Sequence, residues 1–228
     1  MTDRRIAPSI GRRLIAATMA AGLVVAASFM SGGAAFAQTS RDADAETFVQ
    51  TQVAHVLSVL NDRGQSQADK VLSLRAIIDQ VADLPRISNF ALGKYARTIT
   101  PAQRRRFDVV FRDYAEGVYA ARLSEYHGES FKITGSVINR PGDVIVNTVI
   151  FGGKLSQPVA TTWRVLANGA SWKVVDVQVN GIWLAITQQQ DFVSTIDNNG
   201  GNVDVLISQL ERQGQQQAAS ARPRPHER

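Results

Sequence analysis

The stretch that decides the fold is residues 129–186, which read ESFKITGSVINRPGDVIVNTVIFGGKLSQPVATTWRVLANGASWKVVDVQVNGIWLAI. Gly, Pro and Asn residues divide it into four short apolar segments, and the last segment leads directly into a helical pattern. Because the gaps between segments are the length of tight turns, the segments predict an antiparallel meander. The predicted strands are Glu129–Ser136, Asp143–Phe151, Gln157–Ala167 and Trp172–Val179.

These strands are more apolar than a sheet with one wet face requires, since such a sheet alternates apolar and polar residues. In the second strand both faces are apolar: Val144, Val146 and Ile150 form one, and Ile145, Val149 and Phe151 form the other. In the fourth strand, regular alternation sets Lys173, Val175, Val177 and Val179 against Trp172, Val174, Asp176 and Gln178. We therefore expect one covered face and a second face that is only partly covered, which suits a sheet that holds an apolar molecule.

Helices are predicted before and after the sheet, because apolar residues recur there at the spacing of one helical face. The helix with the clearest start is predicted to begin after Thr100, with Pro101 in its first turn and Gln103 completing a capping box, and to run to about Tyr126. The other predicted helices are residues 46–60, 66–81, 87–95, 183–196 and 203–213. The fold class predicted is α+β, with helices packed on one curved four-stranded antiparallel sheet and an apolar pocket between them.

The two ends of the chain are predicted to lie outside the folded domain. Arg4, Arg5, Arg12 and Arg13 precede an apolar run, and Ala35-Phe36-Ala37 supplies a cleavage motif, so residues 1–37 are predicted to be a signal peptide. The general secretory and twin-arginine routes both stay open. Residues 38–212 are predicted to form one domain, and the Gln-, Ala-, Pro- and Arg-rich residues 213–228 a disordered basic tail.

The composition excludes several classes of function. The chain has no cysteine, which excludes disulfides, thiolate metal sites and cysteine catalysis. Residues 1–37 hold four Arg and one Asp, so the remaining 191 residues keep 21 basic and 19 acidic side chains, a net charge of +2. A charge this small gives no indication of nucleic-acid binding.

Chemistry-bearing patterns are nearly missing from the sequence. The three histidines have no metal-ligand spacing, and neither a phosphate-binding Gly-rich loop nor a nucleophile elbow is present. Carboxylates such as Asp176 remain candidates for acid–base chemistry in a pocket. The sequence therefore predicts no enzyme, no catalytic or metal residue and no cofactor.

Two stretches resemble a known family. The first contains Leu92-Gly93-Lys94-Tyr95 and Thr100-Pro101-Ala102-Gln103-Arg104, and the second contains Trp172–Val177, Asn180-Gly181-Ile182 and Asn199-Gly200-Gly201. Both resemble the MlaC family, also called the toluene-tolerance family, of periplasmic phospholipid-binding proteins. The resemblance covers about residues 47–212. It departs from the family at Trp183, where members often have a small residue, and this indolyl side chain is expected to narrow or reshape the mouth of the pocket.

The resemblance implies a periplasmic carrier that shuttles phospholipid between the outer and inner membranes and maintains outer-membrane lipid asymmetry. The implied partners are an inner-membrane ABC transporter with an MCE-domain subunit and an outer-membrane lipoprotein–porin complex, and the implied cargo is a bound phospholipid. A related branch of the family is associated with hopanoids, so a hopanoid or another lipid is an alternative cargo.

An apolar pocket agrees with this implied function. Moving about 30 acyl methylenes into water costs on the order of 20 kcal/mol at about 0.8 kcal/mol each, so a carrier must replace nearly all of the contact that the bilayer provides. We expect the lipid pocket to be lined by aromatic residues of the long helix, by inward-facing residues of the sheet and by residues just beyond it. These are Phe107, Phe111, Tyr114, Ile133, Ile145, Val149, Val159, Trp163, Val165, Val175, Val177, Val179, Ile182 and Leu184.

Two other interpretations stay open at this point. A helix-backed curved sheet also describes small isomerases and dehydratases with cone-shaped α+β folds, for which Asp176 would have to point into the pocket. An interaction module would instead present an apolar face to a protein partner. Arg104, Arg105 and Arg106 form the candidate docking surface in the sequence.

Overall fold

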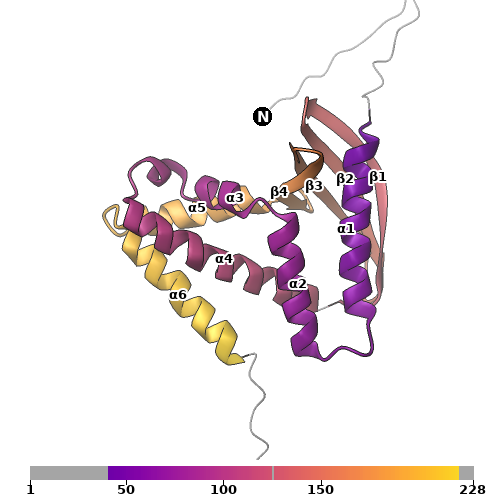
Figure 1. Ribbon diagram of the computed structural model, residues 1–228, viewed down its shortest axis with the longest axis horizontal. Coiled ribbons are helices and arrows are strands. Elements are labelled where there is room, and N and C mark those ends of the chain that lie inside the picture. Colours follow the sequence, from indigo (N-terminus) through magenta and orange to yellow (C-terminus); the bar gives the residue numbers. More distant parts are fainter. Residues whose placement is uncertain (1–40, 125, 221–228) are drawn as a thin grey trace, which may run out of the picture. The chain divides into compact units, whose positions relative to one another are not determined.

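The structure is a computed structural model that describes residues 41–124 and 126–220; the predicted signal peptide lies outside these residues. Figure 1 shows a sheet with a helix lying on it and a group of helices beside it. The elements are α1 (Ala43–Asn61), α2 (Gln67–Val81), α3 (Leu84–Ala91), the 3-10 helix η1 (Gly93–Arg97), α4 (Pro101–Ser124), β1 (Glu129–Arg140), β2 (Asp143–Gly152), β3 (Val159–Asn168), β4 (Ser171–Val179), β5 (Ile182–Trp183), α5 (Leu184–Asp197) and α6 (Val203–Ser220).

The sheet is an antiparallel meander in the order β1-β2-β3-β4-β5, which confirms the predicted α+β class. The fifth strand has only two residues and was not predicted. It pairs with the end of β4 through the tight turn at Asn180 and Gly181, whose φ angles of 48° and 85° are those of a two-residue hairpin turn. Helix α5 starts at the next residue, so sheet and helix are joined without a loop.

One face of the sheet, which we call the closed face, is packed against α1 (Figure 1). Val144 and Val146 of β2 are fully buried there, together with Val165 of β3. They pack against Ala45 and Val49 of α1. The two apolar sets predicted for β2 therefore lie on opposite faces of the sheet. The set that contains Val144 and Val146 packs against α1, and the set that contains Ile145 faces the other way.

The predicted alternation of β4 is wrong at one position. The pairing between β3 and β4 shifts at Arg164/Val165, so Val175 is an extra residue that opposes none on β3. A bulge of this kind reverses the alternation of faces that follows it. Val177 therefore shares the closed face with Val174, while Asp176 pairs with Arg164 on the other face.

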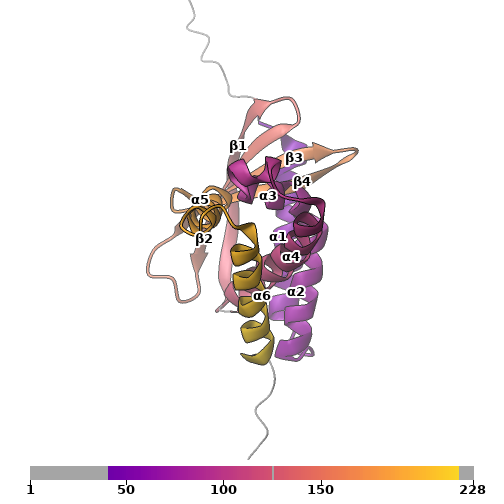
Figure 2. The same ribbon diagram turned by 90° about the vertical axis from the view of Figure 1, so that its left-hand side faces the viewer.

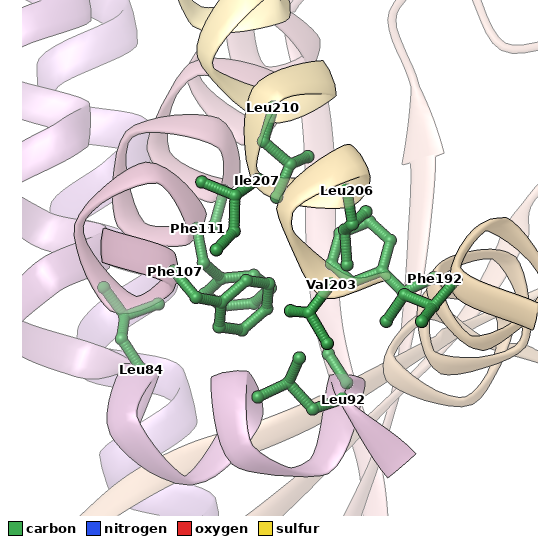
Figure 3. Packing of buried hydrophobic residues seen from close by; sticks show 12 residues of the cluster. Leu84, Leu92, Phe107, Phe111, Phe192, Val203, Leu206, Ile207 and Leu210 are labelled. Atoms are coloured by element: carbon green, nitrogen blue, oxygen red, sulfur yellow. The ribbon is translucent and has the colours of Figure 1, made fainter. Parts of the chain in front are cut away.

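Helices α3, α4, α5 and α6 form a second core, shown in Figure 3. Phe107 is fully buried and Phe111 nearly so; their rings are 5.6 Å apart between centroids, and both meet the ring of Phe192 edge-on. Leucine, isoleucine and valine side chains of α6 close this core. We call α3, η1, α4, α5 and α6 the helical layer.

The predicted capping box at the start of α4 is confirmed. The backbone N–H of Gln103 donates to Oγ1 of Thr100 at 3.2 Å, and the backbone N–H of Thr100 donates to Oε1 of Gln103 at 3.1 Å. The long helix that follows packs against α2 and α6 (Figure 1) and not across the sheet.

Two helix boundaries differ from the prediction. The helix predicted at residues 87–95 is divided into α3 and η1, because Gly93 has a φ of 53° that interrupts regular helix. Helix α6 continues through Ser220, beyond the predicted helix end at residue 213. The Gln- and Ala-rich sequence of that segment is compatible with helix, since both residue types have high helix propensity.

Candidate functional site

The candidate site is the face of the sheet that points away from α1, which we call the open face. Only α1 among the described helices packs extensively against β1 and β2, and it covers the closed face. On the open face, Ile145 and Val149 in the middle of β2 stay partly exposed, and Val137 and Phe151 are each 39% exposed. Apolar side chains in a central strand are normally covered, so this half of the open face is available to an apolar ligand.

A charged pair lies beside these apolar residues. Both oxygens of the Asp143 carboxylate accept hydrogen bonds from Arg164, at 3.0 and 2.8 Å, and Asn139 donates a third at 3.1 Å. The Arg164 hydrogen bonds hold the pKa of Asp143 below its ordinary value, and Asp143 in turn raises the pKa of Arg164. The buried carboxylate is therefore ionised and neutralised within the sheet.

Asp176 also lies on the open face, next to α5. Its Oδ1 accepts hydrogen bonds from the backbone N–H of Val177 at 2.8 Å and of Ala185 at 2.9 Å. Burial raises the pKa of this carboxyl, while the two N–H groups and the charge of Arg164 act in the opposite direction. Because one of these amides, that of Ala185, lies in the first turn of α5, the arrangement is that of a structural cap.

The predicted lining residues fall into four groups, and only one of them lies on the open face. Phe107, Phe111 and Tyr114 belong to the helical layer, where the Tyr114 hydroxyl donates to Oε1 of Gln188 at 2.9 Å. Ile133, Trp163, Val165 and Val177 pack into the core under α1, and the register places Val159 and Val179 on the same closed face, partly exposed. Ile145 and Val149 lie on the open face.

The remaining predicted residues lie around the β4–α5 junction. Val175 is the bulge residue and is buried, Ile182 on β5 is 59% exposed, and Leu184 is the half-buried first residue of α5. Val137 and Phe151 of the open face were not among the predicted lining residues. Phe151 could have been found from the second apolar set of β2, to which it belongs.

Two hollows of about 400 Å³ each lie within the helical part of the structure. One is bordered by α2, α4 and α6 at Arg75, Val110 and Leu210, and the other by α4, α5 and α6 at Tyr114, Phe192 and Gln209. Residues of the sheet line neither of them. Neither hollow therefore lies between helices and sheet, where the apolar pocket was predicted.

The predicted basic docking surface is largely neutralised by neighbouring carboxylates. Arg104 pairs with Asp108 on the next turn of α4, at 2.9 Å. Arg106 pairs with Asp204 at 2.9 Å and Glu211 at 3.2 Å, both on α6. Arg104 and Arg106 form ion pairs within the helical layer, so less of their positive charge is available to a partner protein.

Two features of the described residues bear on other classes of function. No group of three or more His, Cys, Asp or Glu side chains within them could hold a metal ion. In the same part of the chain, none of the helices combines the length and apolar character needed to cross a bilayer.

Comparison with known proteins identifies the family. The family model of the MlaC protein matches residues 50–212. The toluene tolerance protein Ttg2D of Pseudomonas putida is 28% identical over 137 residues, which cover 59% of this chain and 63% of that protein, slightly less than two thirds of its length. The phospholipid-binding protein of Ralstonia solanacearum, solved in complex with a phospholipid, superimposes with a TM-score of 0.66 and 28% identity, covering 77% of this chain and 99% of that one. The chain belongs to the MlaC family.

Proposed function

We propose that this protein is a phospholipid carrier and not an enzyme. The observation that carries the proposal is its structural similarity to the R. solanacearum protein, whose structure contains a phospholipid and which this chain covers over almost its full length. The carboxylates of the open face are engaged in an ion pair and in helix capping, which supports a binding role over acid–base chemistry.

The acyl chains are proposed to lie against the apolar half of the open face. Ile145 and Val149 are partly exposed although they belong to a central strand, and Phe151 extends the same row of side chains. An acyl chain laid along this row would bury apolar surface that otherwise faces water, at about 25 cal/mol per Å². The closed face has no comparable surface to offer, since α1 already covers its central residues.

The transport pathway belongs to the same proposal. We propose that the carrier works in the periplasm after removal of residues 1–37 and exchanges phospholipid with an MCE-type ABC transporter of the inner membrane and with a lipoprotein–porin complex of the outer membrane. Exchange between such partners would maintain outer-membrane lipid asymmetry. The family membership supports this assignment. A carrier of this kind requires little chemistry of its own, because the lipid passes between sites of similar affinity.

The test is to identify the cargo. The protein comprising residues 38–228 would be purified, and its mass would be measured by native and by denaturing mass spectrometry. Any lipid that accounts for the difference in mass would then be extracted and identified. Phospholipid near one molecule per protein would support the proposal. A hopanoid would keep the carrier role and change the cargo, whereas an empty protein that takes up no lipid from liposomes would contradict it.

A further inference from the structure

Helix α5 differs from the other described α-helices in how its N-terminus is capped. The first N–H groups of a helix have no partner inside the helix, and a side chain just before the helix usually supplies one. Five helices follow this rule, with caps from Asp42, Ser66, Asp83, Thr100 and Asn202. The residue before α5 is Trp183, which makes no such hydrogen bond.

The missing cap comes from the sheet. Asp176 lies on β4, nine residues before Ala185, and its Oδ1 accepts the N–H of Ala185 in the first turn of α5. The second hydrogen bond, from the N–H of Val177, fixes the carboxylate relative to the strand. The negative charge also lies at the positive end of the helix dipole.

The position of α5 matters because this helix connects the two cores. Its N-terminus lies at the edge of the sheet, and the helix then runs away from the sheet beside α3, as Figure 1 shows; α5 is seen nearly end-on in Figure 2. Phe192 and Ile196 of α5 are buried in the helical core, and Gln189 donates to the backbone carbonyl of Phe90 on α3 at 2.6 Å. A hydrogen bond between the start of α5 and β4 therefore helps to hold the helical layer against the sheet, together with the bond from the Asp83 N–H to the Val174 carbonyl at the start of α3.

Burial of the charge indicates that the cap is costly. Burial raises the pKa of Asp176, so the ionised carboxylate contributes unfavourably to folding at neutral pH, and this is offset only in part by the amides and by Arg164. Among the described residues, the charged group that acts on it is Arg164 on β3, while the uncharged N–H of Ala185 lies at the positive end of the α5 dipole.

We propose that Asp176 is a positioning residue of the lipid site, which holds α5 against the sheet and thereby retains the bound lipid. The inference rests on the proposed carrier function. It does not require Asp176 to contact the lipid.

The test compares Asp176→Ala and Asp176→Asn with the wild-type protein in two measurements. Hydrogen exchange of residues 184–187 in lipid-free protein should become about tenfold faster in Asp176→Ala, since the Ala185 amide loses its acceptor. Loss of lipid to acceptor liposomes should also become about tenfold faster. Asp42→Ala is the matched control, because it removes a capping aspartate from α1 on the closed face and should leave lipid loss unchanged.

A second variant separates positioning from simple helix capping. Trp183→Asp in the Asp176→Ala background supplies a local cap to α5, as the other helices have. We expect the double variant to show slow hydrogen exchange at residues 184–187 again. Its lipid loss should nevertheless stay faster than that of the Trp183→Asp single variant, which is the reference for both measurements. Full recovery of lipid retention would overturn the positioning role, as would a folded Asp176→Ala variant that loses lipid at the wild-type rate. A wild-type protein that carries no lipid would overturn the carrier function itself. Because hydrogen exchange is measured on lipid-free protein, that result can be told apart from a failure of the positioning role.

Discussion

Substitutions on the two faces of β2 should separate lipid binding from stability. Val149 lies partly exposed on the open face, and Val146 lies three residues earlier, fully buried on the closed face. Val149→Glu places a carboxylate where the acyl chain is proposed to lie. Its effect on folding should be below about 1 kcal/mol, because the carboxylate can reach water in the lipid-free protein.

The expected loss of lipid follows from the cost of burying a polar group. Covering that carboxylate with an acyl chain costs about 3 kcal/mol, even when the group is protonated first. At 1.4 kcal/mol for each tenfold change, retention should weaken by about 100-fold. Val146→Ala should do the opposite: it creates a cavity in the core under α1, lowers the free energy of unfolding by about 2 kcal/mol and leaves lipid occupancy unchanged.

The assay pairs lipid occupancy by native mass spectrometry with urea unfolding of the same preparations. A folded Val149→Glu protein that keeps one lipid per molecule would refute the placement of the acyl chains on the open face. Val177→Glu is informative for the same reason, since strict alternation predicts that it lines the pocket. The structure places Val177 against the α1 core, so this substitution should act through unfolding.

Two further predictions concern stability alone. Because Arg164 lowers the pKa of Asp143, the ion pair contributes stability that is complete above the ordinary carboxyl pKa near 4 and is lost as pH falls through the lower pKa of the folded protein. The substitution Asp143→Asn should therefore lower the free energy of unfolding by about 2 kcal/mol at pH 7 and by much less at pH 2. Urea unfolding at both pH values measures the difference. A larger difference at pH 2 than at pH 7 would contradict this assignment. Gly93→Ala should lower the free energy of unfolding by about 1–3 kcal/mol in the same assay, because φ at this residue is 53° and the added Cβ would lie 2.7 Å from Cγ2 of Val193. An unchanged urea midpoint would show that η1 and α5 can move apart without loss of stability.

The order and type of the elements could be predicted because their signals are local. The capping box at Thr100 and Gln103 involves residues three apart, and the turns that separate the strands are marked by Gly, Pro and Asn. Each such signal acts within a few residues, so it does not depend on the tertiary fold. The short strand β5 was missed because two residues carry no periodicity.

The candidate site was predicted less completely, because periodicity shows that a side chain is buried but not which element buries it. Phe107 and Phe111 recur at the spacing expected for a buried face, and both are buried. Their partners are Phe192 and the α6 side chains, not the sheet. A helix of this length has more than one neighbour, and the sequence of the helix alone does not distinguish them.

The bulge at Val175 decides on which face of β4 the side chain of Asp176 lies. With regular alternation, Trp172, Val174, Asp176 and Gln178 would share a face, and the carboxylate of Asp176 would lie under α1 among Val144, Val146 and Val165. A charge in that core would be unpaired and strongly unfavourable. The extra residue keeps Val174 and Val177 on the closed face and turns Asp176 to the opposite side, beside Arg164 and the amide of Ala185. Both the apolar packing under α1 and the anchoring of α5 therefore depend on the same irregularity in β4. An apolar β-branched residue at the bulge gives no local signal for it, which is why the register had to come from the structure.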